Sequence, residues 1–297
     1  MISIKEIEQI IHNQWGISPI SCRPFYQGGM NYIYAVTVLN QDFMLKVYPA
    51  SRAYIADFEY KMLLNSYNND IKVPKPVGSG LFKSFGFLIY HYVPGSDLQF
   101  EQLTTDQKLG FSTDLIKNLI KFSELPAPFF GTVTEEDIRY ATWNSFLRNT
   151  IKMGTENLKS SGVISLKLVD SISQFLKSYQ PNCSYYGMAW GDLKSENIIA
   201  KEGKLAAILD LESCFYGDPL ISLGYLYARE GPSSFYKSAA ESFGSFLPYT
   251  IEDIYYYALI RLLRISRYLK KPLPTGKTRD PISNYFKGIN TLINDIL

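Results

Sequence analysis

The stretch "AWGDLKSENIIA", residues 189–200, decides how this chain folds. Charged and amide side chains crowd its centre and are followed at once by apolar residues. The apolar run continues as "NIIAKEGKLAAILD", which predicts two strands turning around Gly203. A hairpin brings its two ends together, so Asn197 at its start and Asp210 at its end should lie side by side, with Asp192 in the loop just before them.

This trio of oxygen-bearing side chains has two interpretations. Carboxylate and amide oxygens suit Mg²⁺, which completes its coordination with water and substrate phosphates. Alternatively, the three are ordinary turn residues, each capping its own loop. The cluster by itself leaves both interpretations open.

Residues upstream of the hairpin could serve the same chemistry. Lys46 lies inside the apolar strand "FMLKVYP", where a lysine is either a solvated edge residue or a buried charge that needs a partner. Glu59, in the middle of the following helix, could be that partner. Gly28 and Gly29 lie between two strands, where bare backbone can approach a phosphate closely, although such a pair is usually only a turn.

The chain changes character at Pro94-Gly95. Before this point we predict a helix over 3–15, three strands over 22–49, a helix within 50–69 and a hairpin turning near Lys83. After it, helices are expected over 104–123, 140–159, 164–178, 219–230, 233–245 and 250–270. The predicted fold is therefore α+β, with a small β-rich lobe over 1–93 and a larger helical lobe over 94–297.

The order of these features is more specific than any one of them. A glycine-rich turn, a strand lysine, a helix glutamate, a hinge, a DxxxxN loop and a hairpin aspartate follow one another as in phosphoryl-transfer enzymes. From about residue 24 to about residue 226, the chain resembles the aminoglycoside phosphotransferase family of the protein-kinase-like superfamily. "WGDLKSENII" and "AAILDLESCFYGDPLISL" look like that family's HGDLxxxN and DxExxxxGDPxxDL signatures, and "TWNSFLRNTI" is more weakly similar to the hygromycin phosphotransferase branch.

The resemblance implies a bilobal protein-kinase-like fold and a role for each residue of the loop and hairpin. Asp192 would be the catalytic base, or at least the group that orients the acceptor hydroxyl. Asn197 and Asp210 would hold Mg²⁺ against the nucleotide phosphates. Lys194, placed as in the DLKPEN loop of protein kinases, would meet the transferring phosphate, unless it is only a surface lysine.

The resemblance also assigns the binding of ATP or GTP to the first lobe. Lys46, positioned by Glu59, would contact the α- and β-phosphates, and the backbone of Gly28 and Gly29 would lie against the phosphates. At the hinge, the backbone of His91 and Val93 would pair with the adenine edge. The preceding Tyr90 would then guard the base pocket.

Two positions depart from the family pattern. Trp190 stands where the family usually has histidine, and Ser222 stands where it usually has an acidic residue. In protein kinases the corresponding acidic residue fastens the backbone of the catalytic loop, so both changes could affect one buried junction. A buried indole can donate one N–H and so replace part of a histidine's function. We therefore expect Trp190 to be structural and activity to survive.

The predicted function is an ATP- or GTP-dependent, Mg²⁺-requiring transfer of the γ-phosphate to a hydroxyl of a small molecule. The alternatives are a nucleotide-binding pseudokinase-like module without turnover, favoured by the Trp190 and Ser222 departures, and a protein kinase. The protein kinase is disfavoured because "FYGDP" follows "DLE" almost at once and leaves no activation segment. The acceptor stays open: choline, homoserine, a sugar or an aminoglycoside-type antibiotic hydroxyl all fit.

Composition limits the partners. The 297 residues carry a net charge of +2, so the overall charge favours neither nucleic acid nor an anionic membrane. Three cysteines without CxxC spacing favour a reducing cytoplasm over a disulfide framework or a zinc site. Charged residues interrupt the N-terminal apolar positions, unlike those of a secretion signal. We expect a cytoplasmic protein that binds nucleotide and a small hydroxyl-bearing substrate, in an oligomeric state that the sequence leaves open.

Overall fold

The computed structural model describes residues 2–27, 29–126, 129–134, 139–183, 185–269 and 274–275. Its contacts divide the chain into two compact units. Among the described residues, the first unit comprises 2–94 with 274–275, and the second comprises 95–269. Gly28, one of the expected phosphate-loop glycines, lies outside the described residues.

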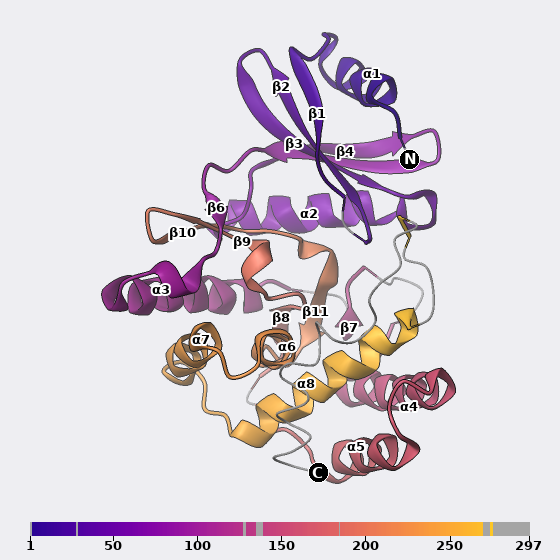
Figure 1. Cartoon of the computed structure of the whole chain (residues 1–297), viewed down its shortest axis with the longest axis vertical. Helices are drawn as coiled ribbons and strands as arrows, with labels where there is room; N and C mark the ends of the chain where they lie inside the picture. Colours follow the sequence, from indigo (N-terminus) through magenta and orange to yellow (C-terminus); the bar gives the residue numbers. More distant parts are fainter. Residues whose placement is uncertain are drawn as a thin grey trace. The chain divides into compact units, whose positions relative to one another are not determined.

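The first unit is built on a five-stranded antiparallel sheet of order β1-β2-β3-β5-β4 (Figure 1). Its strands are β1 (Ser21–Gln27), β2 (Tyr32–Val38), β3 (Gln41–Tyr48), β4 (Pro76–Phe82) and β5 (Phe85–His91). β2 alternates buried and half-buried residues, as β-branched and aromatic side chains do on a sheet with one covered face. Leu39 and Asn40, both with positive φ, form the tight turn into β3.

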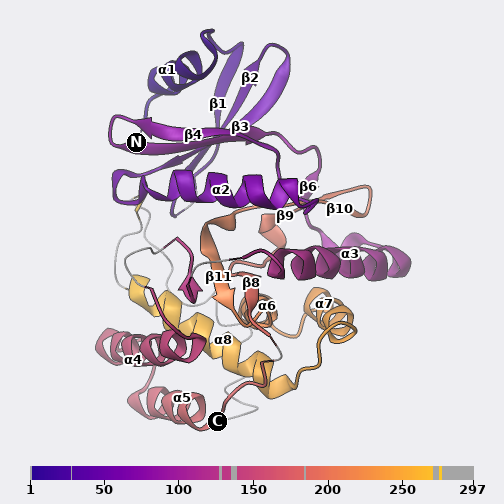
Figure 2. The same ribbon diagram turned by 180° about the vertical axis from the view of Figure 1, so that it is seen from behind.

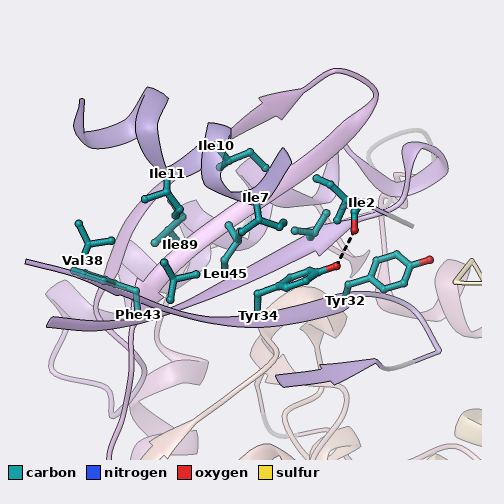
Figure 3. Close-up of a cluster of buried hydrophobic side chains, with 12 residues drawn as sticks. Ile2, Ile7, Ile10, Ile11, Tyr32, Tyr34, Val38, Phe43, Leu45 and Ile89 are labelled. Atoms are coloured by element: carbon teal, nitrogen blue, oxygen red, sulfur yellow. Dashed lines mark hydrogen bonds between the residues drawn. The ribbon is translucent and has the colours of Figure 1, made fainter. Parts of the chain in front are cut away.

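Two helices accompany this sheet. Helix α1 (Ile4–Trp15) starts at a capping box between Ser3 and Glu6 and turns its buried isoleucines onto the sheet. Figure 3 shows this core, in which the α1 isoleucines meet β-strand residues such as Leu45 and Ile89. Helix α2 (Ile55–Asn68) packs against β4 and β5 and carries Glu59.

The second unit is mainly helical (Figure 2). Its α-helices are α3 (Thr105–Ser123), α4 (Trp143–Ser161), α5 (Leu166–Ser178), α6 (Ile221–Glu230), α7 (Ser234–Gly244) and α8 (Ile251–Ile265). Helix α8 packs against α4 and α6, and two glycines permit its close approach. A Cβ added at Gly154 of α4 would collide with Leu263, and one at Gly224 of α6 would collide with Tyr257.

Two small antiparallel sheets complete the second unit. One has the order β10-β9-β6, from β6 (Ser96–Asp97), β9 (Ile198–Lys201) and β10 (Lys204–Ile208). The other has the order β7-β11-β8, from β7 (Gly131–Thr132), β8 (Gly187–Trp190) and β11 (Cys214–Gly217). None of the helices in the described part of the chain is long and apolar enough to cross a bilayer.

The predicted α+β class is confirmed, with an antiparallel sheet in the first unit and helices in the second. Each helix expected after Pro94 is present, although the last ends at Ile265 rather than near residue 270. Strands β8 and β11 were not predicted. They have four residues each and pair across 24 positions, Trp190 with Cys214, so local pattern carries little signal for them.

Candidate active site

The predicted hairpin forms and places its two ends together. Strands β9 and β10 pair from Ile198↔Ile208 to Lys201↔Lys204, and the Leu209 N–H donates to the Asn197 carbonyl at 2.8 Å. The loop 191–197 therefore runs from the end of β8 to the start of β9, and the segment 209–213 runs from β10 to β11. Both loops are held at each end by a sheet, which fixes the side chains that they carry.

Asp192 is held by three donors from the second unit. Its Oδ2 accepts from Lys194 Nζ at 2.7 Å and from Asn197 Nδ2 at 2.9 Å. Its Oδ1 accepts from Arg261 Nη2 at 2.7 Å, and its side chain is 14% exposed. Burial by itself raises the pKa of this carboxyl, but the Lys194 ammonium and the Arg261 guanidinium outweigh it and hold the pKa well below its usual range. Asp192 is therefore ionised and oriented at neutral pH.

Asn197 and Asp210 offer oxygens of the kind that Mg²⁺ prefers. The Asn197 amide nitrogen donates to both the backbone carbonyl and the carboxylate of Asp192, so its Oδ1 is turned to the other side of the amide. Asp210 has φ 64° and ψ 64°, a left-handed conformation that few residues other than glycine, asparagine and aspartate adopt. Glu212 is buried two residues further on, and its carboxylate lies within 4.8 Å of that of Asp210. This oxygen-only donor set fits a hard divalent cation.

Trp190 is the structural residue that the sequence predicted. It is 1% exposed, and its indole Nε1 donates to the backbone carbonyl of Asp210 at 3.1 Å. Its backbone N–H donates to the Ser222 hydroxyl at 3.1 Å, so both departures from the family pattern meet at one junction, as expected. The glycine that follows has no room for a side chain, because a Cβ at Gly191 would collide with the Ser213 carbonyl. The tryptophan thus connects the two loops that carry Asp192 and Asp210.

In the first unit, Lys46 and Glu59 form the predicted ion pair. Lys46 Nζ lies 2.7 Å from Glu59 Oε2, and the two side chains are 5% and 2% exposed. The Tyr48 hydroxyl donates to the same Glu59 oxygen, and the Lys46 ammonium lies 5.3 Å from the Tyr48 ring centroid. Lys46 is therefore a buried charge with partners, not a solvated edge residue.

The other described residues of the first unit that the sequence assigned to nucleotide binding are Gly29, His91 and Val93. The Gly29 carbonyl accepts from both the backbone N–H and the hydroxyl of Thr275, at 3.2 and 2.9 Å. The His91 N–H is committed to the Lys75 carbonyl at 2.9 Å, which leaves the His91 carbonyl as the group available for a base edge. Val93 follows the end of β5 and is half-buried.

Arg261 is the main site residue that the sequence analysis missed. It comes from the middle of α8, where its guanidinium also lies 4.9 Å from the Tyr225 ring centroid and donates to the Gly191 carbonyl at 3.3 Å. The sequence feature that could have pointed to Arg261 is its place within the apolar run "YYYALIRLLRIS". A charge in the interior of a buried helix requires a partner, but the pattern does not say which one.

Comparisons with known proteins identify the family of this chain and its fold. A profile of the Phosphotransferase enzyme family (APH) matches residues 21–251. No curated protein gives a significant match to the sequence.

Solved structures share the fold at low sequence identity. A thermostable mutant of aminoglycoside phosphotransferase APH(4)-Ia, in ternary complex with AMP-PNP and hygromycin B, has a TM-score of 0.68 at 17% identity, covering 89% of this chain and 91% of that chain. Spectinomycin phosphotransferase APH(9)-Ia, in complex with ADP and spectinomycin, has a TM-score of 0.68 at 14% identity, covering 99% and 97%. A putative fructosamine-3-kinase from Haemophilus somnus has a TM-score of 0.66 at 19% identity, covering 99% and 97%. These likenesses identify the fold as the bilobal protein-kinase-like fold.

Proposed function

This chain belongs to the phosphotransferase enzyme family and is a small-molecule kinase, and we propose that it transfers the γ-phosphate of ATP or GTP to a hydroxyl of its acceptor. The observation that carries the proposal is the Asp192 carboxylate, ionised and held by Lys194, Asn197 and Arg261. Phosphoryl transfer needs positioning and charge neutralisation more than covalent chemistry, and a fixed carboxylate among cations provides both.

In the proposed reaction, Asp192 accepts the hydrogen bond of the acceptor hydroxyl and orients its oxygen toward the γ-phosphorus. The new O–P bond forms as the bond from the γ-phosphorus to the β–γ bridging oxygen breaks, and the hydroxyl proton passes to Asp192. A carboxylate with a lowered pKa is a weak base, so orientation is its larger contribution and the proton moves late. Lys194 is placed to neutralise charge on the transferring phosphate.

Asn197 and Asp210 are the residues that we propose to hold Mg²⁺, with Glu212 beside them. When bound, the ion neutralises charge on the nucleotide phosphates. Trp190 supports this function from within the second unit, because its hydrogen bond to the Asp210 carbonyl fixes the backbone of a proposed ligand.

The nucleotide is assigned to residues of the first unit. Lys46, fixed by Glu59 and Tyr48, contacts the α- and β-phosphates, with the backbone of Gly28 and Gly29 beside them. The backbone of His91 and Val93 pairs with the base. A buried ion pair suits this role because its geometry is already set before nucleotide binds.

The acceptor is a small molecule and not a peptide. Only residues 211–220 separate Asp210 from α6, so no activation segment is available as a peptide platform. The structural neighbours, which bind hygromycin B or spectinomycin or are named a putative fructosamine-3-kinase, favour a hydroxyl of an aminoglycoside-type antibiotic or of a sugar as the acceptor. The cysteines among the described residues are free thiols, as is usual in a reducing compartment. Together with the proposed use of ATP, this supports a cytoplasmic location.

Two measurements test the proposal. A ligand that binds only the folded state raises the unfolding temperature, so ATP or GTP with Mg²⁺ should stabilise the protein. An unchanged unfolding temperature at millimolar nucleotide would overturn the proposed function. ADP release should then be measured with hygromycin B, spectinomycin, fructosamines, choline and homoserine as acceptors. The acceptor that raises ADP release above the rate in buffer identifies the substrate class.

A further inference from the structure

The two oxygens of Asp192 differ in their surroundings. An ionised carboxylate offers about four lone-pair positions, two on each oxygen. Both positions on Oδ2 are used, by Lys194 at 2.7 Å and by Asn197 at 2.9 Å. Within the described part of the chain, Oδ1 receives one donor, Arg261 Nη2 at 2.7 Å. The position that remains for an acceptor hydroxyl is therefore on Oδ1, beside the guanidinium.

The Arg261 guanidinium is itself fixed from several sides. It donates to the Gly191 carbonyl at 3.3 Å as well as to Asp192, and it lies 4.9 Å from the Tyr225 ring centroid. Helix α8, which carries it, packs so closely on α4 and α6 that glycines are needed at the contacts. A donor on a rigid helix, 69 residues from its partner in sequence, can define the plane and rotamer of the carboxylate.

We propose that Arg261 is a positioning residue of the reaction, which orients the Asp192 carboxylate so that the remaining lone pair of Oδ1 receives the acceptor hydroxyl. This inference rests on the proposed function. Helix α8 lies outside the sequence motifs of the loop and hairpin. Through Arg261 and Asp192, it would nevertheless help to align the acceptor. It also places a fixed cation next to the acceptor oxygen, on the side of Asp192 opposite to Lys194 and Asn197.

The test compares Arg261→Met and Arg261→Lys with a control on the same helix, Arg264→Met. Arg264 lies one turn along α8, with its guanidinium 4.8 Å from the Phe215 ring centroid. Because misplacement of a catalytic group by about 1 Å costs up to about 100-fold, Arg261→Met should lower kcat by about 10- to 100-fold while KM for ATP changes by less than about twofold. The kcat of Arg261→Lys should lie between those of Arg261→Met and the parent, since lysine retains the charge but cannot donate to Asp192 and Gly191 with the fixed geometry of a guanidinium. The control should keep kcat within about threefold of the parent.

Chemical rescue separates positioning from folding. Guanidinium ion added to Arg261→Ala at concentrations below unfolding should raise kcat saturably, and it should not do so for Arg264→Ala. A defect of folding would be worsened by a denaturant, so rescue cannot arise from general stabilisation. A kcat of Arg261→Met equal to that of the parent would overturn the inference. So would a lowered kcat of Arg261→Ala that guanidinium does not raise and that comes with a lowered unfolding temperature, which would leave Arg261 a structural role.

A readout independent of turnover distinguishes this inference from the proposed function. Amide hydrogen exchange in the loop 191–197 should be faster in Arg261→Met than in the parent and in Arg264→Met, because the loop loses an anchor on Gly191 and Asp192. A parent protein that neither binds nor turns over ATP overturns the proposed function. Unchanged exchange in the loop overturns the positioning role of Arg261 even if the parent is active.

Discussion

The Lys46–Glu59 pair of the first unit and the Asp192 cluster of the second unit hold charge in different ways. In the first, the two side chains are 5% and 2% exposed, and the Tyr48 hydroxyl also donates to Glu59. The second is a carboxylate of 14% exposure with donors from a loop and from α8, and with one oxygen still able to accept. The Lys46–Glu59 pair is therefore held by burial, whereas the Asp192 carboxylate is held by hydrogen bonds and can still accept another from a substrate.

The largest expected effect tests the Asp192 carboxylate. Asp192→Asn keeps the shape of the side chain but removes its charge, so turnover with the identified acceptor should fall by about 10²- to 10⁴-fold. Nucleotide binding with Mg²⁺, measured by calorimetry, should be nearly unchanged because Asn197 and Asp210 remain.

Asp170→Asn is the matched control for this prediction. Asp170 pairs with Lys159 at the same distance, 2.7 Å, but its side chain is 64% exposed. The control should turn over at the parent rate. If Asp192→Asn does so as well, Asp192 is not the catalytic residue.

The second prediction tests the buried Lys46–Glu59 pair. Glu59→Gln removes the Glu59 carboxylate from the buried Lys46 ammonium, and removing one partner of a buried ion pair costs about 3–5 kcal/mol of unfolding free energy. Urea unfolding of the variant should show this loss, together with weaker ATP binding.

The control for the second prediction lies on the same helix. Asp57 pairs with Lys61 across one turn of α2, and the side chains are 62% and 70% exposed. Asp57→Asn should cost only about 0.3–0.5 kcal/mol, the usual value of an exposed helix pair. Equal losses in the two variants would mean that burial does not distinguish the Glu59 pair.

The smallest expected effect concerns the junction that supports Asp210. Trp190→Phe keeps a buried ring but leaves the Asp210 carbonyl without its indole donor, which should cost about 1–3 kcal/mol by denaturant unfolding. Trp190→His should also be destabilised, because the smaller ring leaves space in a site shaped for indole.

A double-mutant cycle tests whether the two departures at this junction are coupled. Ser222 is in contact with residue 190, because its hydroxyl accepts from the Trp190 N–H. An aspartate at position 222 would make a hydrogen bond to the junction restored by Trp190→His, so Ser222→Asp should recover part of the stability that Trp190→His loses. Residues in contact should show non-additivity of more than about 0.5 kcal/mol. Strict additivity would show that the two substitutions are independent of one another.

The local features of this protein were determined by its sequence. Apolar spacing predicted the helices, and β-branched runs and turn residues predicted the strands of the five-stranded sheet and the hairpin around Gly203. The motif order predicted the phosphotransferase fold. These signals lie within a few residues of one another, where side-chain periodicity and turn geometry act directly. The ion pair between Lys46 and Glu59 was predictable for the same reason, since a buried strand lysine needs a nearby opposite charge.

The tertiary structure alone decided which distant groups complete the site. Arg261 reaches Asp192 across 69 residues, the Trp190 indole meets the Asp210 carbonyl, and β8 pairs with β11 to hold both loops. A buried arginine or indole must find a partner, but which partner depends on how α8 packs against α4 and α6. That packing sums many weak apolar contacts over the whole unit, and no short stretch of sequence encodes the sum.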